Sequence, residues 1–120
     1  MKILGIGVDI ENVKRFRGLD IKSDGRFLNK IYTKSELQYC FSRQNPAQHL
    51  AVRFAGKEAA IKALAGIGSK VVPVKDIQIL NANNGSPAVK MPKAFANVHI
   101  HISLSHCQDK AIAFVIIDRH

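Results

Sequence analysis

The first residues of the chain alternate between apolar side chains and small or acidic ones, which is the two-residue period of a β-strand over 3–10. One face carries Leu4, Ile6, Val8 and Ile10, and the other carries Gly5, Gly7 and Asp9. Glycines in a strand let another backbone or a ligand come close. We therefore expect Asp9 to lie on a closely packed face, where its carboxylate needs a partner.

Three helices are predicted in the first half of the chain. A short one is expected over 24–31, and the capping box Thr33-Lys34-Ser35-Glu36 begins a second. The longest has Asn45 as its N-cap and Pro46 as its first residue, and it ends at Gly66.

An acidic residue interrupts the apolar stripe that we trace along this long helix. The stripe consists of Leu50, Phe54, Ile61 and Ala65. Glu58 completes the series between Phe54 and Ile61, so we expect a carboxylate on the side that faces the core. Such a group is costly unless it is paired or binds a cation, and Lys62, one turn on, is one candidate partner.

The second half of the chain has the patterns of strands. A strand over 71–80, a turn over 81–87 and a returning strand over 88–91 predict a hairpin. Two further strands are expected over 98–105 and 111–117. We predict one α+β domain over 1–120, with helices packed on a largely antiparallel sheet.

Composition excludes several classes of protein. With 47% hydrophobic and 22% charged residues, the chain is typical of a globular protein rather than a disordered one. No stretch approaches the roughly 20 apolar residues that cross a bilayer, so we expect no membrane partner. Cys40 and Cys107 lack Cys-x-x-Cys spacing, which favours two reduced thiols in a cytoplasmic protein.

The formal net charge of +9 favours anionic partners without choosing among them. Nucleic acid, anionic lipid, a phosphorylated cofactor and an acidic protein would all be attracted. A nucleic-acid-binding domain would favour aromatic residues among the basic ones, yet the chain has six Phe, two Tyr and no Trp. A second alternative is a non-catalytic interaction module.

Several residues have the chemistry of a site. Asp9 and Glu58 offer hard oxygen ligands for Mg²⁺, although a salt bridge or helix cap would also explain Asp9, and a pair with Lys62 would explain Glu58. His106 follows a strand, where it could bind phosphate or be solvated. The remaining candidates are His99 and His101, whose alternate spacing could ligate a metal. We interpret these two as surface residues because no acid or cysteine accompanies them.

Three segments together carry a family resemblance. They are Gly5-Ile6-Gly7-Val8-Asp9-Ile10-Glu11, Phe54-Ala55-Gly56-Lys57-Glu58-Ala59-Ala60-Ile61-Lys62-Ala63-Leu64 and Ile102-Ser103-Leu104-Ser105-His106. The first lacks the third glycine of a dinucleotide fingerprint. In this order, the three resemble the signatures of the holo-acyl-carrier-protein synthases. These phosphopantetheinyl transferases move the phosphopantetheine of coenzyme A to a serine of acyl carrier protein, which supports fatty acid biosynthesis.

The resemblance implies roles for individual residues. Asp9 and Glu58 would bind Mg²⁺, and Glu58 and Lys62 would be catalytic. Further contacts to the coenzyme are implied for Lys62, His106, Arg53, Lys57, Gly85 and Pro87. Two positions depart from the family pattern: Ile67 stands where Thr is usual, and Ser86 where a basic residue is common.

The resemblance also implies an assembly. Short members of this family form homotrimers with active sites between subunits, so we expect a homotrimer. Acyl carrier proteins are acidic, and we expect them to approach the basic side chains of Lys14, Arg15 and Arg17.

Overall fold

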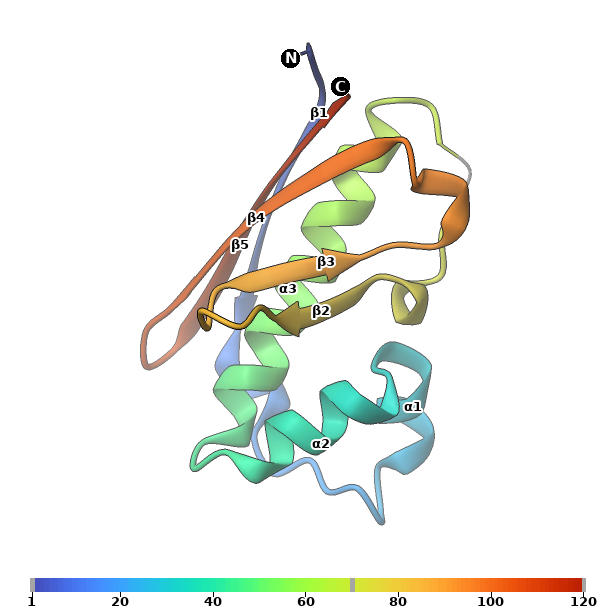
Figure 1. Cartoon of the computed structure of the whole chain (residues 1–120). Helices are drawn as coiled ribbons and strands as arrows, with labels where there is room; N and C mark the ends of the chain where they lie inside the picture. The colour runs from blue at the N-terminus through green and yellow to red at the C-terminus, as the bar shows by residue number, and fades with distance from the viewer. Residues whose placement is uncertain (1, 70, 120) are drawn as a thin grey trace.

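A three-stranded antiparallel sheet, crossed on one face by a long helix, forms the body of the molecule (Figure 1). The computed structural model describes residues 2–69 and 71–119. The sheet has the order β1-β5-β4, with β1 Lys2–Asn12, β5 Lys110–Arg119 and β4 Val98–His106. The crossing helix is α3, Pro46–Ala65. Helices and antiparallel strands together confirm the α+β prediction.

Smaller elements cover the sides of this body. A two-stranded hairpin joins β2, Gln78–Asn81, to β3, Pro87–Lys90, and the helices α1, Gly25–Ile31, and α2, Lys34–Ser42, lie together at one end (Figure 1). The short 3₁₀ helices are η1 Val13–Phe16, η2 Val74–Asp76 and η3 Lys93–Phe95. Among the described residues, no helix combines the length and the hydrophobicity needed to cross a membrane.

The glycine face of β1 packs directly against the backbone of α3. A Cβ atom built on Gly5 would lie 2.3 Å from the carbonyl oxygen of Ala63, and one on Gly7 would lie 1.9 Å from that of Ala59. Both distances are far below van der Waals contact. The close approach expected from the sequence is therefore between the strand and a helix, and it brings Asp9, on the same face, toward α3.

The most buried side of α3 is not the stripe that we expected. Phe54, Glu58 and Ile61 are half-buried and Ala65 is exposed, although Leu50 is buried as predicted. The fully buried side consists instead of Ala55, Gly56, Ala59, Ala60, Ala63 and Leu64. Small side chains let the helix axis approach the sheet, but they contribute little to a hydrophobicity pattern. Glu58 thus lies at the margin of the core, not within it.

Local sequence signals fix the ends of the helices. In α2, the Thr33 hydroxyl accepts from the Glu36 backbone while the Glu36 carboxylate accepts from the Thr33 backbone, so the capping box is confirmed. Pro46 begins α3, and Gly66 ends it in the right-handed helical region. The side chain of Asn45, expected to cap this helix, makes no capping hydrogen bond.

The strand expected over 71–80 is mostly wrong. Only its end, from Gln78, belongs to β2, whereas Val74–Asp76 forms η2. Pro73 explains the difference, because it has a fixed φ angle and no N–H group to donate to a ladder. The predicted hairpin is confirmed in a shorter form, and the two last strands are confirmed and extended.

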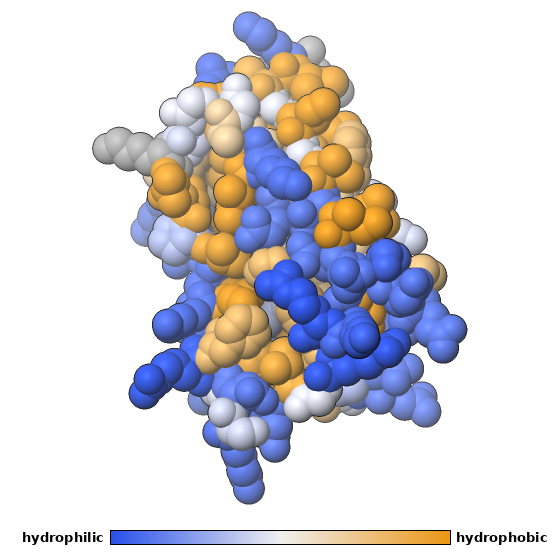
Figure 2. Space-filling view, turned by 180° about the vertical axis from the view of Figure 1, so that it is seen from behind, coloured by the Kyte–Doolittle hydropathy of each residue, from blue (hydrophilic) through white to orange (hydrophobic). Residues whose placement is uncertain are grey.

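The face of the sheet that points away from α3 exposes apolar side chains of β1 and β5 to solvent. Exposed fractions there are 61% for Ile6, 50% for Val8, 60% for Ile10, 41% for Ile112 and 43% for Phe114. We call these five residues the outer patch. Figure 2 shows hydrophobic surface over the half of the molecule that carries the sheet, and more hydrophilic surface at the end with α1 and α2. A contiguous patch of this kind marks an interaction surface.

Candidate active site

Three carboxylates meet where β1 passes the middle of α3. Asp9 and Glu11 are two residues apart on β1 and so share its inner face, and Glu58 comes from α3. We call them the carboxylate cluster. Asp9 Oδ2 is buried, and no hydrogen-bond partner for it lies within 2–69 or 71–119. A buried carboxylate oxygen without a donor is costly, so the cluster has an unmet requirement for positive charge.

The pKa values of the cluster reflect this requirement. Burial, and then the neighbouring Asp9 carboxylate, raise the pKa of Glu11 to about 7, although Arg15 opposes the shift. Burial also raises the pKa of Glu58, again with Asp9 as the second cause. Because each carboxylate makes ionisation of its neighbours harder, a cation bound among them would be stabilised.

Lys62 pairs with Asp9 rather than with Glu58. Its ammonium donates to Asp9 Oδ1 at 3.1 Å and to the backbone carbonyl of Val8 at 2.9 Å. The Lys62 side chain is 55% exposed, so the pair is only partly shielded from water. A salt bridge was one explanation that the sequence left open for Asp9, and this salt bridge is present. It satisfies one of the two carboxylate oxygens of Asp9.

The side chain of Lys57 is buried and does not reach the surface. This lysine, expected to add charge for the coenzyme, has a fully buried side chain whose ammonium lies 2.8 Å from Glu36 Oε1. It also donates to the backbone carbonyls of Ile77 at 2.6 Å and Val74 at 3.3 Å. With no exposed atoms, it cannot contact a phosphate in this conformation, and we correct its assignment to a structural one.

Arg53 and His106 belong to a second group on the other side of α3. The Arg53 guanidinium lies 4.2 Å from the ring centre of Tyr39 and donates to Asn81 Oδ1 at 3.3 Å. His49 contacts both Tyr39 and His106, with ring centres 5.7 and 6.2 Å apart respectively. We call Tyr39, His49, Arg53 and His106 the histidine–arginine cluster.

Positive charge dominates this second cluster. Burial lowers the pKa of His49, and the charges of Arg53 and Arg43 lower it further. Beside Arg53 and Tyr39 lies a surface cavity of about 230 Å³, which Ser35, Glu36, Ile79, Leu80 and Asn81 also line. A cavity lined by an aromatic ring and a guanidinium suits a planar base and a phosphate.

Gly85 lies in the turn between β2 and β3, and Pro87 is the first residue of β3, paired with Asn81. Gly85 has a φ angle of +86°, which disfavours any other residue, and its N–H donates to Ala82 at 2.8 Å. The Ser86 hydroxyl donates to Asn84 Oδ1 at 2.6 Å, which uses it within the turn. The turn is present as expected, while its contact with a nucleotide stays a prediction.

The basic residues expected to attract a carrier protein directly follow β1. Lys14, Arg15 and Arg17 are exposed, and Arg15 forms an ion pair of 2.7 Å with Glu11. The basic segment is thus linked to the carboxylate cluster. A surface cavity of about 370 Å³ lies beside it, lined among others by Phe16, Arg17 and Leu19.

Three members of these clusters, Glu11, Tyr39 and His49, were not predicted from the sequence. Two of them lie at a regular spacing from a predicted site residue: Glu11 is two positions from Asp9 on a strand, and His49 is four positions from Arg53 on a helix. Periodicity applied outward from Asp9 and Arg53 would have found these two.

Comparison with known proteins identifies the class of this α+β fold and its acidic site. The family model described as the 4′-phosphopantetheinyl transferase superfamily matches residues 5–115. The chain therefore belongs to this superfamily.

Individual relatives narrow the class to the holo-[acyl-carrier-protein] synthases. One from Thermodesulfovibrio yellowstonii is 47% identical over 115 residues, which are 96% of this chain and 98% of the relative. One from Protochlamydia amoebophila is 44% identical, with 94% and 96% covered. The crystal structure of such a synthase from Bacillus anthracis, in complex with CoA (3′,5′-ADP), has a TM-score of 0.80 at 29% identity, with 98% of each chain covered. The expected enzyme class is confirmed, and the interaction module is set aside.

Proposed function

We propose that the chain transfers the phosphopantetheine arm of coenzyme A to a serine hydroxyl of an acyl carrier protein, releases adenosine 3′,5′-bisphosphate and so supports fatty acid biosynthesis. The carboxylate cluster would be the site of this reaction, with Mg²⁺. The buried Asp9 Oδ2, which lacks a donor among the described residues, carries the proposal because it requires a positive charge where two further carboxylates already meet.

The residues of the cluster fit Mg²⁺ by their chemistry. Asp9 and Glu58 would hold the ion, since carboxylate oxygens are its preferred protein ligands and few of them are needed when substrate phosphates complete the shell. When bound, Mg²⁺ would neutralise charge on the pyrophosphate as the bond to the leaving group breaks.

Two side chains of the protein would take part directly in the transfer. Lys62, which reaches the strand edge with a largely exposed stem, would pair with a phosphate oxygen as negative charge develops there. Glu58 would accept the proton of the attacking serine.

The histidine–arginine cluster would bind the nucleotide end of the coenzyme. Arg53 would supply charge for phosphate, His106 a ring nitrogen within reach of it, and Tyr39 a ring for stacking. Gly85 in the hairpin turn and Pro87 at the start of β3 would border the same region.

The positions of the two clusters favour a site shared between subunits. Arg53 and Glu58 are five residues apart on α3, which separates their directions by about 140° at 3.6 residues per turn. His106 is on β4 and Asp9 on β1, the two edge strands, with β5 between them. A coenzyme molecule that contacts both clusters would therefore fit best between two chains, with one cluster supplied by each chain.

The outer patch supports a homotrimer as the assembly that provides such shared sites. It exposes apolar side chains from β1, the strand that carries Asp9, and from the neighbouring β5. Burial of apolar surface at about 25 cal/mol per Å² would favour subunit contact there. A closed ring of three chains would bury the patch in every copy.

The carrier protein would dock on Lys14, Arg15 and Arg17. This segment continues β1 beyond Glu11, so an acidic partner bound to it would bring its serine toward the carboxylate cluster. We also propose a cytoplasmic location, which the two free thiols of Cys40 and Cys107 support.

A direct assay tests the proposed function. The protein is incubated with apo-acyl carrier protein, coenzyme A and Mg²⁺, and the carrier is weighed by mass spectrometry. We expect a gain equal to one phosphopantetheine, no gain when Mg²⁺ is chelated, and none on a carrier whose acceptor serine is replaced by alanine. A carrier of unchanged mass under the complete conditions would contradict the proposal.

A further inference from the structure

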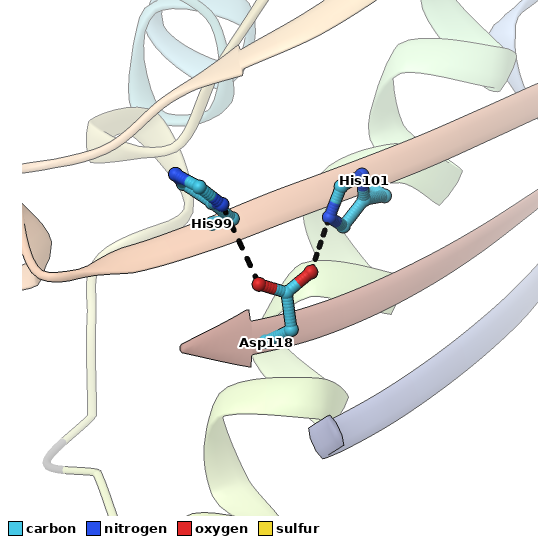
Figure 3. Close-up of side chains that lie close together, drawn as sticks. All are labelled: His99, His101 and Asp118. Atoms are coloured by element: carbon cyan, nitrogen blue, oxygen red, sulfur yellow. Dashed lines mark hydrogen bonds and ion pairs between the residues drawn. The ribbon is translucent and has the colours of Figure 1, made fainter. Parts of the chain in front are cut away.

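Two histidines and one aspartate converge on the sheet face that points away from α3, remote from the carboxylate cluster. His99 and His101 come from β4 and Asp118 from β5, and all three side chains point toward one another (Figure 3). His99 Nδ1 lies 3.4 Å from one Asp118 carboxylate oxygen, and His101 Nε2 lies 2.5 Å from the other. We propose that these residues bind a divalent transition-metal ion of the Zn²⁺ class.

The strand register explains why the three side chains meet. His99 and His101 are two residues apart on β4, which puts both on the same face of the sheet. Asp118 is paired directly with His99 across the ladder, and His101 is its diagonal neighbour. No acid accompanies the two histidines along the chain, and we therefore interpreted them as surface residues without a metal role. In the folded sheet, however, Asp118 lies beside both of them.

The distances suit a tetrahedral ion. One potential ligand atom from each residue can be chosen so that all three lie within 4.8 Å of one another. Metal–ligand bonds of about 2.0–2.1 Å at a tetrahedral angle separate neighbouring ligand atoms by about 3.4 Å. The His99–Asp118 distance already has this value. A small rotation of the exposed His101 ring would lengthen the His101–Asp118 distance toward it.

The electrostatics of Asp118 also favour a cation. Its side chain is only 4% exposed, whereas those of His99 and His101 are 43% and 58% exposed. A buried carboxylate is costly without compensating charge, and a divalent ion held between the two rings and Asp118 would supply it. The exposed rings leave a path from solvent to the carboxylate, so an ion could enter without unfolding.

The donor set distinguishes this ion from Mg²⁺. Two imidazole nitrogens and one carboxylate favour Zn²⁺, Co²⁺, Ni²⁺ or Cu²⁺, whereas Mg²⁺ prefers oxygens. Three protein ligands leave a fourth position for water or for a group from another molecule. Since the ligands come from neighbouring strands, the ion would tie the C-terminal end of β5 to the start of β4.

Calorimetric titration of the metal-free full-length protein with Zn²⁺ tests the proposal. Excess Mg²⁺ is present throughout to occupy the carboxylate cluster. We expect one Zn²⁺ per chain and a higher melting temperature on binding. Co²⁺ in place of Zn²⁺ should give the intense visible absorption of a tetrahedral centre. Failure of the wild-type protein to bind Zn²⁺ would overturn the site and leave the three residues as an ion pair.

Variants locate the binding. His99→Gln together with His101→Gln should weaken Zn²⁺ binding by at least about a hundredfold, since even the loss of an outer-shell partner costs ten- to a hundredfold. The matched control is His49→Gln, which removes a histidine outside the site and should leave binding unchanged. Zn²⁺ affinity that survives in the double variant, or that falls equally in the control, would overturn the assignment. Asp118→Asn should also weaken Zn²⁺ binding. If this variant does not fold because Asp118 is buried, the double variant of the exposed histidines still tests the site.

Discussion

Lys57 and Glu36 form an ion pair in which both side chains are completely buried, with 2.8 Å between Nζ and Oε1. Glu36 also caps α2 and accepts from the backbone of Ile79 at 2.8 Å, so one carboxylate joins α2, α3 and β2. Burial lowers the pKa of Lys57, and the charge of Glu36 opposes this shift. The pair therefore holds the helical end of the molecule against the hairpin.

Breaking this pair should destabilise the fold. Because Lys57→Met leaves a buried carboxylate without its cation, we expect a loss of about 3–5 kcal/mol in the free energy of unfolding. The double variant Glu36→Gln, Lys57→Met should lose less than the sum of its single changes. Urea denaturation measures all three, and Lys30→Met, an exposed lysine of α1, serves as the control. Additive losses would contradict direct coupling.

Glu58→Gln should separate catalysis from stability. The change keeps the shape of the side chain and removes its charge, so turnover should fall by about a hundredfold or more, the effect of a few kcal/mol. The melting temperature should change little, because Glu58 is half-buried at the margin of the core. Turnover is measured across a Mg²⁺ titration, with Asp76→Asn, an exposed acid of η2, as the control. Near-normal turnover with an unchanged Mg²⁺ requirement would refute the metal-ligand role.

The contact between β1 and α3 predicts a strong effect of a single methyl group. Gly7→Ala would drive its Cβ into the Ala59 carbonyl oxygen, 1.9 Å away, and backbone atoms cannot move aside cheaply. We expect a loss of about 3 kcal/mol or more by thermal or chemical unfolding. Gly25→Ala is the matched control, since the nearest atom to its Cβ would be 3.9 Å away. Equal stability of the two variants would show that α3 can shift away from the strand.

The sequence predicted the elements whose signals are local. The capping box at Thr33, the proline at the start of α3 and the alternation in β4 each depend on residues a few positions apart. Asp9 and Glu58 were also singled out from local patterns, and the structure brings them close together, while their catalytic roles stay a prediction. The strand over 71–80 failed because apolar composition outweighed the effect of Pro73.

Features that depend on long-range packing could not be read from the sequence. The apolar face of β1 would normally be assigned to the core, yet glycines leave the space that α3 occupies, and the apolar side chains face outward. In the same way, Asp118 meets His99 only through the register of β4 on β5. Registers follow from the whole sheet, and no local pattern specifies them.

The outer patch should control the state of association. Phe114→Glu introduces a charge on its exposed apolar surface, so we expect the variant to sediment as a monomer and to lose most activity at micromolar concentration. The fold should persist, because Phe114 is 43% exposed in the single chain. Ala94→Glu, on exposed η3, should leave the association unchanged. A fully active wild-type monomer would contradict the shared site.

The two thiols should differ in reactivity and in their effect on stability. Burial raises the pKa of Cys40 from 9.0 to about 11, whereas Cys107 is exposed. A thiol reagent should modify Cys107 rapidly and Cys40 only after unfolding. Between pH 9 and 11 the unfolded chain loses the Cys40 proton while the folded chain keeps it, so stability should fall across this range.

The variant Cys40→Ala isolates this contribution. Its stability should decline less steeply than that of the wild-type protein over the same range of pH. Parallel declines in the two proteins would contradict the raised pKa.

The side chains of Lys57 and Glu58, which are adjacent in the sequence, point about 100° apart around the axis of α3. One points inward to Glu36, and the other points to the edge of the sheet near Asp9. In a saturation mutagenesis library, position 57 should therefore be scored through protein yield and position 58 through carrier modification at normal yield. Anyone who grafts this dipeptide onto another scaffold would need to transfer two unrelated partners with it.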